Sequence, residues 1–219
     1  MARISPIPQT ATECDADFAA AGRDLPARAA WDFESLSWLA PRVPLRQVIY
    51  ILGAGQDPIK EQFRLLRTRL EDLAQTRPLK TILVTSSLPD EGKTFVALNL
   101  AAALCQRGRN RVLLLEADLR RPSCCSALGL SAVPGLAECC ANRAPVPGFV
   151  YRVSGLDLCL LPAGERPTSA IDWLASSRMA RVVAETGRVF DWVLVDSAPL
   201  LPVADSVVLS RQCDGILLV

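Results

Sequence analysis

Short apolar runs alternate with amphipathic stretches along the chain from residue 58 to its end. Five of these runs have the length and the aliphatic or β-branched composition of strands that are buried on both faces. They cover residues 81–84, 111–119, 156–162, 190–196 and 214–219. We therefore predict five strands of a mostly parallel sheet.

Apolar residues recur at helical spacing between the predicted strands. One stripe, opened by Asp57-Pro58, consists of Ile59, Phe63, Leu66, Leu70 and Leu73. A second, largely buried helix starts at Thr94, and a third covers residues 169–187 and closes at Gly187. Strands that alternate with helices in this way predict an α/β fold, with a doubly wound, mostly parallel sheet and helices on both faces.

The first 45 residues lack this periodicity and carry five prolines among alanines and mixed charges. We predict a loosely ordered N-terminal extension over 1–45, in front of a single domain over 46–219. Trp31, Phe33, Trp38 and Leu39 could dock on a partner or on the domain itself. A mobile tail with a few exposed apolar side chains is the alternative that the composition favours.

The composition narrows the class of protein. With 24 Lys and Arg against 23 Asp and Glu, the net charge of +1 gives no general attraction to nucleic acid or to membranes. Histidine is absent, so any general base must be a carboxylate or another group. The eight cysteines show no C-x-x-C spacing, which favours reduced thiols. Since we find neither an apolar signal segment nor a run long enough to span a bilayer, we expect a cytoplasmic protein.

A polar loop joins the first predicted strand to the second helix. Its sequence is Ser86-Ser87-Leu88-Pro89-Asp90-Glu91-Gly92-Lys93-Thr94. In a phosphate-binding loop of this kind the backbone amides converge on an anion, the lysine reaches the outer phosphates and the threonine hydroxyl can ligate Mg²⁺. Because Ser87 stands where the strict pattern has its first glycine, an ordinary turn with a solvated lysine is the alternative.

Three acidic residues follow buried strands. Glu116 and Asp118 lie at alternate positions at the end of the second strand, and Asp196 ends the fourth. Ligands of parallel sheets bind beyond the carboxyl ends of the strands, which is where the phosphate loop also lies. These carboxylates therefore predict metal binding and proton abstraction, and the alternative is that the first two cap the next segment.

Glu61, Arg64 and Arg67 lie at three-residue spacing on the first helix, beside its apolar stripe. They could pair within the helix, which would add only a few tenths of a kcal/mol. They could equally pair with another subunit through forked guanidinium–carboxylate contacts. From these residues alone, a solvated face is the favoured interpretation.

Taken together, these segments resemble one protein family. The loop 86–94, the segment 115–122 (LEADLRRP) and the segment 195–199 (VDSAP) resemble, in this order, the Walker A, A′ and B motifs of the bacterial tyrosine kinases of capsular and exopolysaccharide systems. Glu61-x-x-Arg64-x-x-Arg67 resembles the oligomerisation motif of that family. The resemblance covers about residues 58–219 and implies a P-loop NTPase fold of the MinD-like subclass.

The resemblance also implies roles for individual residues and a reaction with ATP and Mg²⁺. Lys93, Asp118 and Asp196 would be catalytic, and Asp118 would be the acid nearest to the attacking tyrosine hydroxyl. The nucleotide would contact Ser87, Pro89, Asp90, Glu91, Gly92, Lys93, Thr94, Phe95 and Arg120, and the metal would be held by Thr94, Glu116, Asp118 and Asp196. The partners would be further copies of the chain, joined through Glu61, Arg64 and Arg67, and a membrane polysaccharide co-polymerase that recruits the protein to the inner face of the membrane.

Two features depart from the family pattern. The first acid of the A′ motif is Glu116 instead of the usual aspartate, and only Tyr50 and Tyr151 are available as tyrosines, without the tyrosine-rich C-terminal tail of the family. We expect either a C-terminally truncated domain, or phosphorylation of another protein, or lost activity. The alternatives are a MinD- or partition-type ATPase, whose signature lysine position holds Leu88 here, and a nucleotide-binding scaffold of a polysaccharide-export complex.

Overall fold

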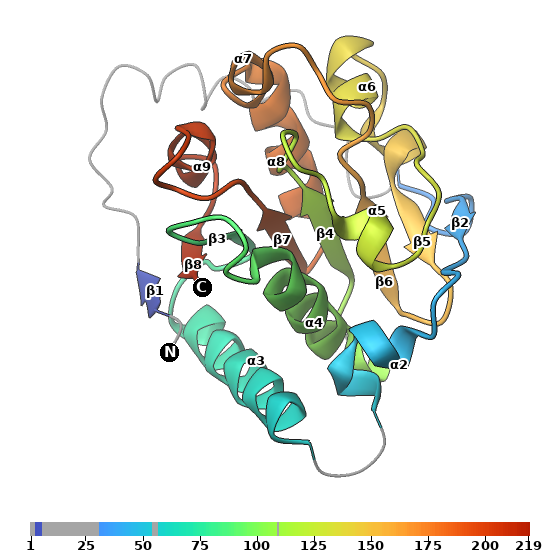
Figure 1. The fold of residues 1–219 in the computed structure, drawn as a ribbon, viewed down its shortest axis with the longest axis vertical. Coiled ribbons are helices and arrows are strands. Elements are labelled where there is room, and N and C mark those ends of the chain that lie inside the picture. Colours follow the sequence, from blue (N-terminus) through green and yellow to red (C-terminus); the bar gives the residue numbers. More distant parts are fainter. Residues whose placement is uncertain (1–2, 6–30, 54–56, 109) are drawn as a thin grey trace.

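A mostly parallel sheet of eight strands organises the residues that the computed structural model describes, which are 3–5, 31–53, 57–108 and 110–219 (Figure 1). The strands are β1 (Arg3–Ser5), β2 (Trp38–Leu39), β3 (Thr81–Thr85), β4 (Val112–Glu116), β5 (Tyr151–Val153), β6 (Leu158–Leu161), β7 (Trp192–Asp196) and β8 (Gly215–Leu218). Their order is β1-β8-β3-β7-β4-β6-β5-β2. The five inner strands are parallel and are the five that the apolar runs predict, whereas β1 and β5 pair antiparallel to their inner neighbours.

The register of the inner strands places three predicted site segments side by side. β7 lies between β3 and β4, with Val84 and Glu116 both paired to Asp196. The loop after β3 and the acidic ends of β4 and β7 therefore meet at one edge of the sheet. The topology confirms that the predicted site lies beyond the carboxyl ends of the strands.

Helices cover both faces of the sheet. They are α2 (Leu45–Val48), α3 (Pro58–Thr76), α4 (Lys93–Cys105), α5 (Cys124–Ala127), α6 (Leu136–Ala141), α7 (Ala170–Leu174), α8 (Ser177–Val189) and α9 (Asp205–Ser210), with short 3-10 turns η2 (Tyr50–Leu52), η3 (Gln106–Gly108) and η4 (Val146–Phe149). No helix within these described residues combines the length and the apolar composition that crossing a bilayer requires.

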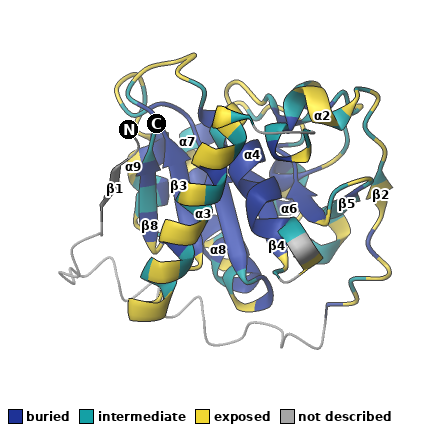
Figure 2. Ribbon diagram, turned by 90° about the horizontal axis from the view of Figure 1, so that it is seen from below, coloured by how far each residue is buried: buried dark blue, intermediate teal, exposed yellow. Residues whose placement is uncertain are grey.

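Two apolar cores follow from the alternation of side chains along the strands. Ile82 and Val84 point into a core shared with α3, α4 and η2, whereas Leu83 points into a second core shared with α6, α7 and α8. Figure 2 shows the inner strands and α4 buried and the outer side of α3 exposed. The fold is thus the predicted α/β arrangement of a mostly parallel sheet with helices on both faces, and α4 is the predicted buried helix.

The prediction of one continuous helix over 169–187 is wrong in detail. The chain forms α7, breaks at Ala175 and Ser176, and resumes as α8. Ser176 is the N-cap of α8 and accepts a hydrogen bond from the Met179 amide at 3.2 Å, which offers the backbone an alternative to a continuous helix. Gly187 does not end α8 but lies inside it. The helix passes close to β3 at this position, because a Cβ added to Gly187 would lie 3.2 Å from Thr81 Oγ1.

The segment 31–45 is more closely attached to the domain than a loosely ordered extension would be. Trp31 is 5% exposed, and its ring packs edge-on against Phe190, with ring centres 5.6 Å apart. Phe33 packs on the same ring at 5.5 Å, while Trp38 and Leu39 form β2 beside β5. Burial of these aromatic side chains holds the segment on the domain, so docking, the less favoured interpretation, is what the structure shows for this part. Residues 6–30 lie outside the described residues, and the domain division at residue 45 stays a prediction.

The cysteines in the described part of the chain are all free thiols, as the spacing predicts. Most of them are buried, where they pack as small apolar side chains. Burial raises the pKa of the Cys125 thiol to about 11 and that of Cys140 to about 12, so both stay protonated at neutral pH. Cys14 lies outside the described residues.

Candidate active site

The loop between β3 and α4 is held by its own hydrogen bonds. The Ser86 hydroxyl donates to the Leu88 carbonyl at 2.7 Å, and the Leu88 amide donates to Glu91 Oε2 at 2.8 Å. Gly92 is the N-cap of α4 with a φ of 92°, a backbone conformation that L side chains rarely adopt. The glycine therefore lets the chain turn directly into α4, so that Lys93 starts a 13-residue helix whose first amides face the loop.

A cavity of about 920 Å³ lies in front of this loop. It is lined by Pro89, Asp90, Gly92, Lys93, Thr94, Phe95, Asp118, Arg120, Arg121, Pro122, Ser123, Arg166, Ala198, Pro199, Pro202 and Val203. Most of the predicted nucleotide contacts are among these residues. Ser87 and Glu91 are not, because they belong to the scaffold of the loop: the Ser87 carbonyl accepts the Leu201 amide at 3.2 Å, and Glu91 binds within the loop.

Asp196 lies fully buried behind the cavity wall. Its Oδ2 accepts a hydrogen bond from the Thr94 hydroxyl at 2.7 Å, and its Oδ1, also buried, has no hydrogen-bond partner within the described part of the chain. Burial raises the pKa of Asp196 to about 7; Glu116 and Asp118 add to the rise, and the Thr94 hydrogen bond and Lys93 oppose it. A cation beside Thr94 would supply the missing partner and hold the carboxylate ionised, so the donors present fit Mg²⁺.

Glu116 is tied to the backbone around it. Its Oε1 accepts the amides of Ser123 at 2.5 Å and Cys124 at 2.6 Å, and its Oε2 accepts the Ala163 amide at 3.0 Å. The side chain is 1% exposed and joins the end of β4 to the start of α5 and to the loop after β6. A metal-ligand role for Glu116 stays a prediction. The structure shows the alternative that the sequence left open, because Glu116 caps the next segment by accepting the amides at the start of α5.

Asp118 and Arg120 face the cavity with defined partners. Asp118 is 7% exposed, and its Oδ1 accepts the Arg121 amide at 2.9 Å, which orients the carboxylate. Arg120 donates through Nε and Nη2 to the two oxygens of buried Asp205, at 2.7 and 3.0 Å. Hydrogen bonding to Asp205 raises the pKa of Arg120 above its ordinary value. The fork fixes the guanidinium at the cavity rim.

Some residues of the site carry no signal in the sequence. Ser123 shares a hydrogen bond of 2.8 Å with the Thr94 hydroxyl, Arg166 enters from the loop after β6, and Asp205 starts α9. None of the three belongs to a motif that we identified. Only the position of Ser123, directly after the segment 115–122, could have indicated its place.

The predicted oligomerisation residues lie on α3, away from the cavity. Arg64 donates to Glu61 Oε1 at 2.5 Å, and both side chains are about half exposed. Arg67 instead points to the end of α4, where its Nη1 donates to the Ala103 carbonyl at 3.1 Å and to Gln106 at 3.3 Å. The motif therefore divides into an exposed pair and an arginine engaged inside the domain.

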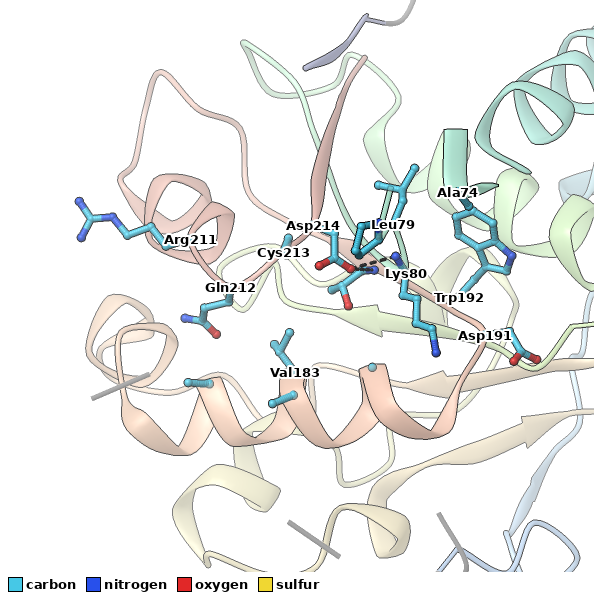
Figure 3. A pocket seen from close by; sticks show the side chains of 15 residues that line it. Ala74, Leu79, Lys80, Val183, Asp191, Trp192, Arg211, Gln212, Cys213 and Asp214 are labelled. Carbon is cyan, nitrogen blue, oxygen red and sulfur yellow. Dashed lines mark hydrogen bonds between the residues drawn. The ribbon is translucent and has the colours of Figure 1, made fainter. Parts of the chain in front are cut away.

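A second cavity, of about 690 Å³, lies at the opposite edge of the sheet, where β3, β7 and β8 begin (Figure 3). Its walls include Leu79, Val183 and Trp192, and Asp214 Oδ2 accepts the amides of Lys80 at 2.9 Å and Thr81 at 2.8 Å. None of the predicted site residues lines this cavity. The predicted catalytic and metal-binding residues lie at the carboxyl edge instead.

A lysine-threonine loop that leads from a buried strand into a helix, with a carboxylate on the adjacent strand facing the threonine, defines a P-loop NTPase. The solved structure of the MinD cell-division ATPase of Pyrococcus furiosus shares this fold, with a TM-score of 0.51 over 61% of this chain and 56% of that one, at 24% identity. No protein-family model matches the chain.

Comparison of the chain with individual proteins shows the family to which it belongs. The chain is 34% identical over 159 residues to the tyrosine-protein kinase YwqD of Bacillus subtilis, covering 73% of this chain and 67% of YwqD. It is 32% identical over 172 residues to the succinoglycan biosynthesis transport protein ExoP of Rhizobium meliloti, covering 77% of this chain but only 22% of ExoP. The kinase domain of the Escherichia coli tyrosine kinase ETK superposes with a TM-score of 0.73, at 27% identity, over 79% of this chain and 66% of that domain. The chain belongs to the bacterial tyrosine-protein kinase family, and one of its relatives, ExoP, is named as a succinoglycan biosynthesis transport protein.

Proposed function

We propose that this chain binds ATP with Mg²⁺ and transfers the terminal phosphoryl group to tyrosine hydroxyls. The observation that carries the proposal is Asp196, whose Oδ2 accepts the hydroxyl of Thr94 in the phosphate loop while its Oδ1 is buried without a partner in the described part of the chain. A carboxylate in this position requires a cation for its charged form to be stable. Membership of the tyrosine-kinase family supplies the reaction.

The loop and the residues around it have separate roles in this proposal. The first amides of α4 and Lys93 hold the β- and γ-phosphates, and Thr94 and Asp196 hold Mg²⁺, directly or through water. The bound Mg²⁺ neutralises charge on the phosphate oxygens. Lys93 is only 8% exposed, so its charge acts where water screens it little. Arg120, fixed by Asp205, adds positive charge at the rim.

Asp118 is the proposed acceptor of the tyrosine proton. Its carboxylate lines the cavity together with Lys93 and Thr94, and the Arg121 amide fixes one of its oxygens. An attacking hydroxyl that enters the cavity opposite the loop would meet the other oxygen first. Because phosphoryl transfer depends mainly on positioning and charge neutralisation, Asp118 contributes by orienting the hydroxyl as well as by taking its proton.

The acceptor tyrosine comes from another molecule in this proposal. The Tyr151 hydroxyl donates to the Pro134 carbonyl at 2.9 Å, and the Tyr50 ring packs against Phe95 with ring centres 5.5 Å apart. Both tyrosines are therefore engaged in packing contacts of their own domain. We infer that the substrates are tyrosines of a partner protein, and that a membrane polysaccharide co-polymerase brings the domain to the inner face of the cell membrane.

Phosphotyrosine detection by mass spectrometry tests the proposal. The purified chain is incubated with Mg-ATP and a tyrosine-rich peptide, next to Lys93→Met and Asp118→Asn. Lys80→Met is the matched control, because Lys80 lies at the opposite edge of the sheet. We expect phosphotyrosine with the unaltered chain and with the control, and a loss of at least about 100-fold in both site variants. ATP hydrolysis without phosphotyrosine would instead indicate a MinD-type ATPase, and nucleotide binding without either activity would indicate a scaffold.

A further inference from the structure

Three ligand groups of mixed chemistry lie together behind the hydroxyls of Thr94 and Ser123. Cys124, the first residue of α5, is fully buried, and its thiol donates to Asp196 Oδ2 over 3.7 Å. One ligand atom each from Glu116, Cys124 and Asp196 lies within 4.8 Å of the other two. A single small cation can bridge atoms at this spacing, since metal–oxygen and metal–sulfur bonds are about 2.0–2.3 Å long.

Free coordination capacity is present in the same cluster. Asp196 is 0% exposed, and its Oδ1 is buried without a hydrogen-bond partner among the described residues. Glu116 Oε2 accepts one hydrogen bond, from the Ala163 amide, and a carboxylate oxygen has two lone pairs. The cluster therefore offers the sulfur of Cys124, an unoccupied oxygen of Asp196 and a second oxygen of Glu116.

The sulfur ligand selects the kind of cation. Mg²⁺ binds oxygen and retains waters, and a thiol adds nothing to its site, whereas Zn²⁺ and Co²⁺ bind mixed sulfur and carboxylate sets with four ligands. We propose that Glu116, Cys124 and Asp196 form a binding site for a thiophilic divalent cation such as Zn²⁺. Cys124 binds as the thiolate, so that metal binding displaces its proton, and the three side chains supply three of the four ligands.

This site has a consequence for the kinase reaction, and that part rests on the proposed function. Asp196 cannot serve a thiophilic cation and the catalytic Mg²⁺ in the same geometry. Bound Zn²⁺ would therefore exclude Mg²⁺ and inhibit phosphoryl transfer. The cation site itself does not depend on the activity, so the two claims can fail separately.

Cobalt absorption tests the site on the full chain. Metal-free protein, kept reduced, is titrated with Co²⁺, and the near-ultraviolet spectrum is recorded, where a thiolate bound to Co²⁺ gives an intense charge-transfer band. We expect this band at one equivalent, and its loss when one equivalent of Zn²⁺ is added, because Zn²⁺ competes for the same ligands. If the unaltered chain shows no band, the proposal is wrong.

Cysteine variants test which sulfur atom binds the cation. Cys124→Ser and Cys124→Ala should lose the band, whereas Cys125→Ser should keep it, because the adjacent Cys125 is not part of the cluster. Circular dichroism on each variant checks that it is folded. A band that survives in folded Cys124 variants, or that disappears in Cys125→Ser instead, would place the thiolate elsewhere and overturn the proposal. A band without any kinase activity would keep the cation site and remove only its inhibitory role.

Discussion

At the scale of single residues, Glu116 is tied to the backbone around it. The sequence suggests either a longer version of a metal-binding aspartate or a cap of the next segment. In the structure, the extra methylene lets one carboxylate reach three amides, those of Ser123, Cys124 and Ala163. A buried carboxylate that is satisfied by backbone donors stabilises the segments that it joins. Glu116 therefore acts on the site by fixing α5 and Ser123 beside Thr94.

Shortening this side chain gives the first prediction. Glu116→Asp should no longer reach all three amides, and each buried amide left unpaired costs about 1–3 kcal/mol. We expect a lower free energy of unfolding in urea. Glu165→Asp is the control, since it removes the same methylene from an exposed side chain, and it should change stability by less than about 0.5 kcal/mol. Equal stability of Glu116→Asp and the unaltered chain would rule out the tethering role.

The positions of residues within a motif were predictable, but their neighbours were not. Lys93, Thr94 and Asp196 follow strands that are themselves visible as apolar runs, so their convergence at the carboxyl edge follows from the sheet topology alone. Asp205 meets Arg120 across 85 residues of sequence. Such a contact is set by how α9 packs, and no local pattern encodes it.

At the scale of elements, the length and the burial of a strand decide whether the sequence could predict it. The inner strands are buried on both faces and therefore appear as continuous apolar runs. β2 and β5 have two and three residues and lie at the margin, too short to give a periodic signal. The sequence predicts a loose extension over 1–45 because five prolines among alanines and mixed charges interrupt any periodicity, although the aromatic residues from Trp31 onward provide an anchor.

The anchor of this segment gives a pH-dependent prediction. The Trp31 ring N–H donates to Glu185 Oε1 on α8 at 3.2 Å, and burial raises the pKa of Glu185 above 4.5, opposed by the Trp31 hydrogen bond and by Arg178. The folded state therefore holds the proton of the Glu185 carboxyl more tightly than the unfolded state does. The stabilisation that protonated Glu185 contributes is fully present at low pH. It is lost as the pH rises through the pKa of Glu185 in the folded state.

Glu185→Gln keeps an acceptor for Trp31 but does not titrate. Relative to the unaltered chain, the variant should gain stability as the pH is raised from about 4.5 to neutrality. Urea unfolding at both pH values measures the difference, with Glu165→Gln as the exposed control. A difference that stays constant between the two pH values would show that Glu185 is not perturbed in the folded state.

At the scale of the whole molecule, α3 presents a surface for assembly. Glu61 and Arg64 lie exposed on this helix, and Ile59 and Leu65, 40% and 47% exposed, lie on the same helix. An exposed ion pair contributes about 0–1 kcal/mol within one domain, so the pair can exchange partners at small cost when a second copy docks. Arg67 is different because it binds the Ala103 carbonyl at the end of α4.

Two arginine variants separate assembly from folding. Arg64→Ala should lower the molar mass measured by light scattering after size-exclusion chromatography and change the free energy of unfolding by less than about 0.5 kcal/mol. Arg67→Ala should lower the free energy of unfolding by about 1–2 kcal/mol, because a helix-terminal carbonyl loses its charged donor. Arg69→Ala, on the same helix and exposed, should do neither. If the unaltered chain is monomeric at every concentration, or if its oligomer survives Arg64→Ala, the exposed pair is a solvated surface feature, and assembly of the domain must use another face.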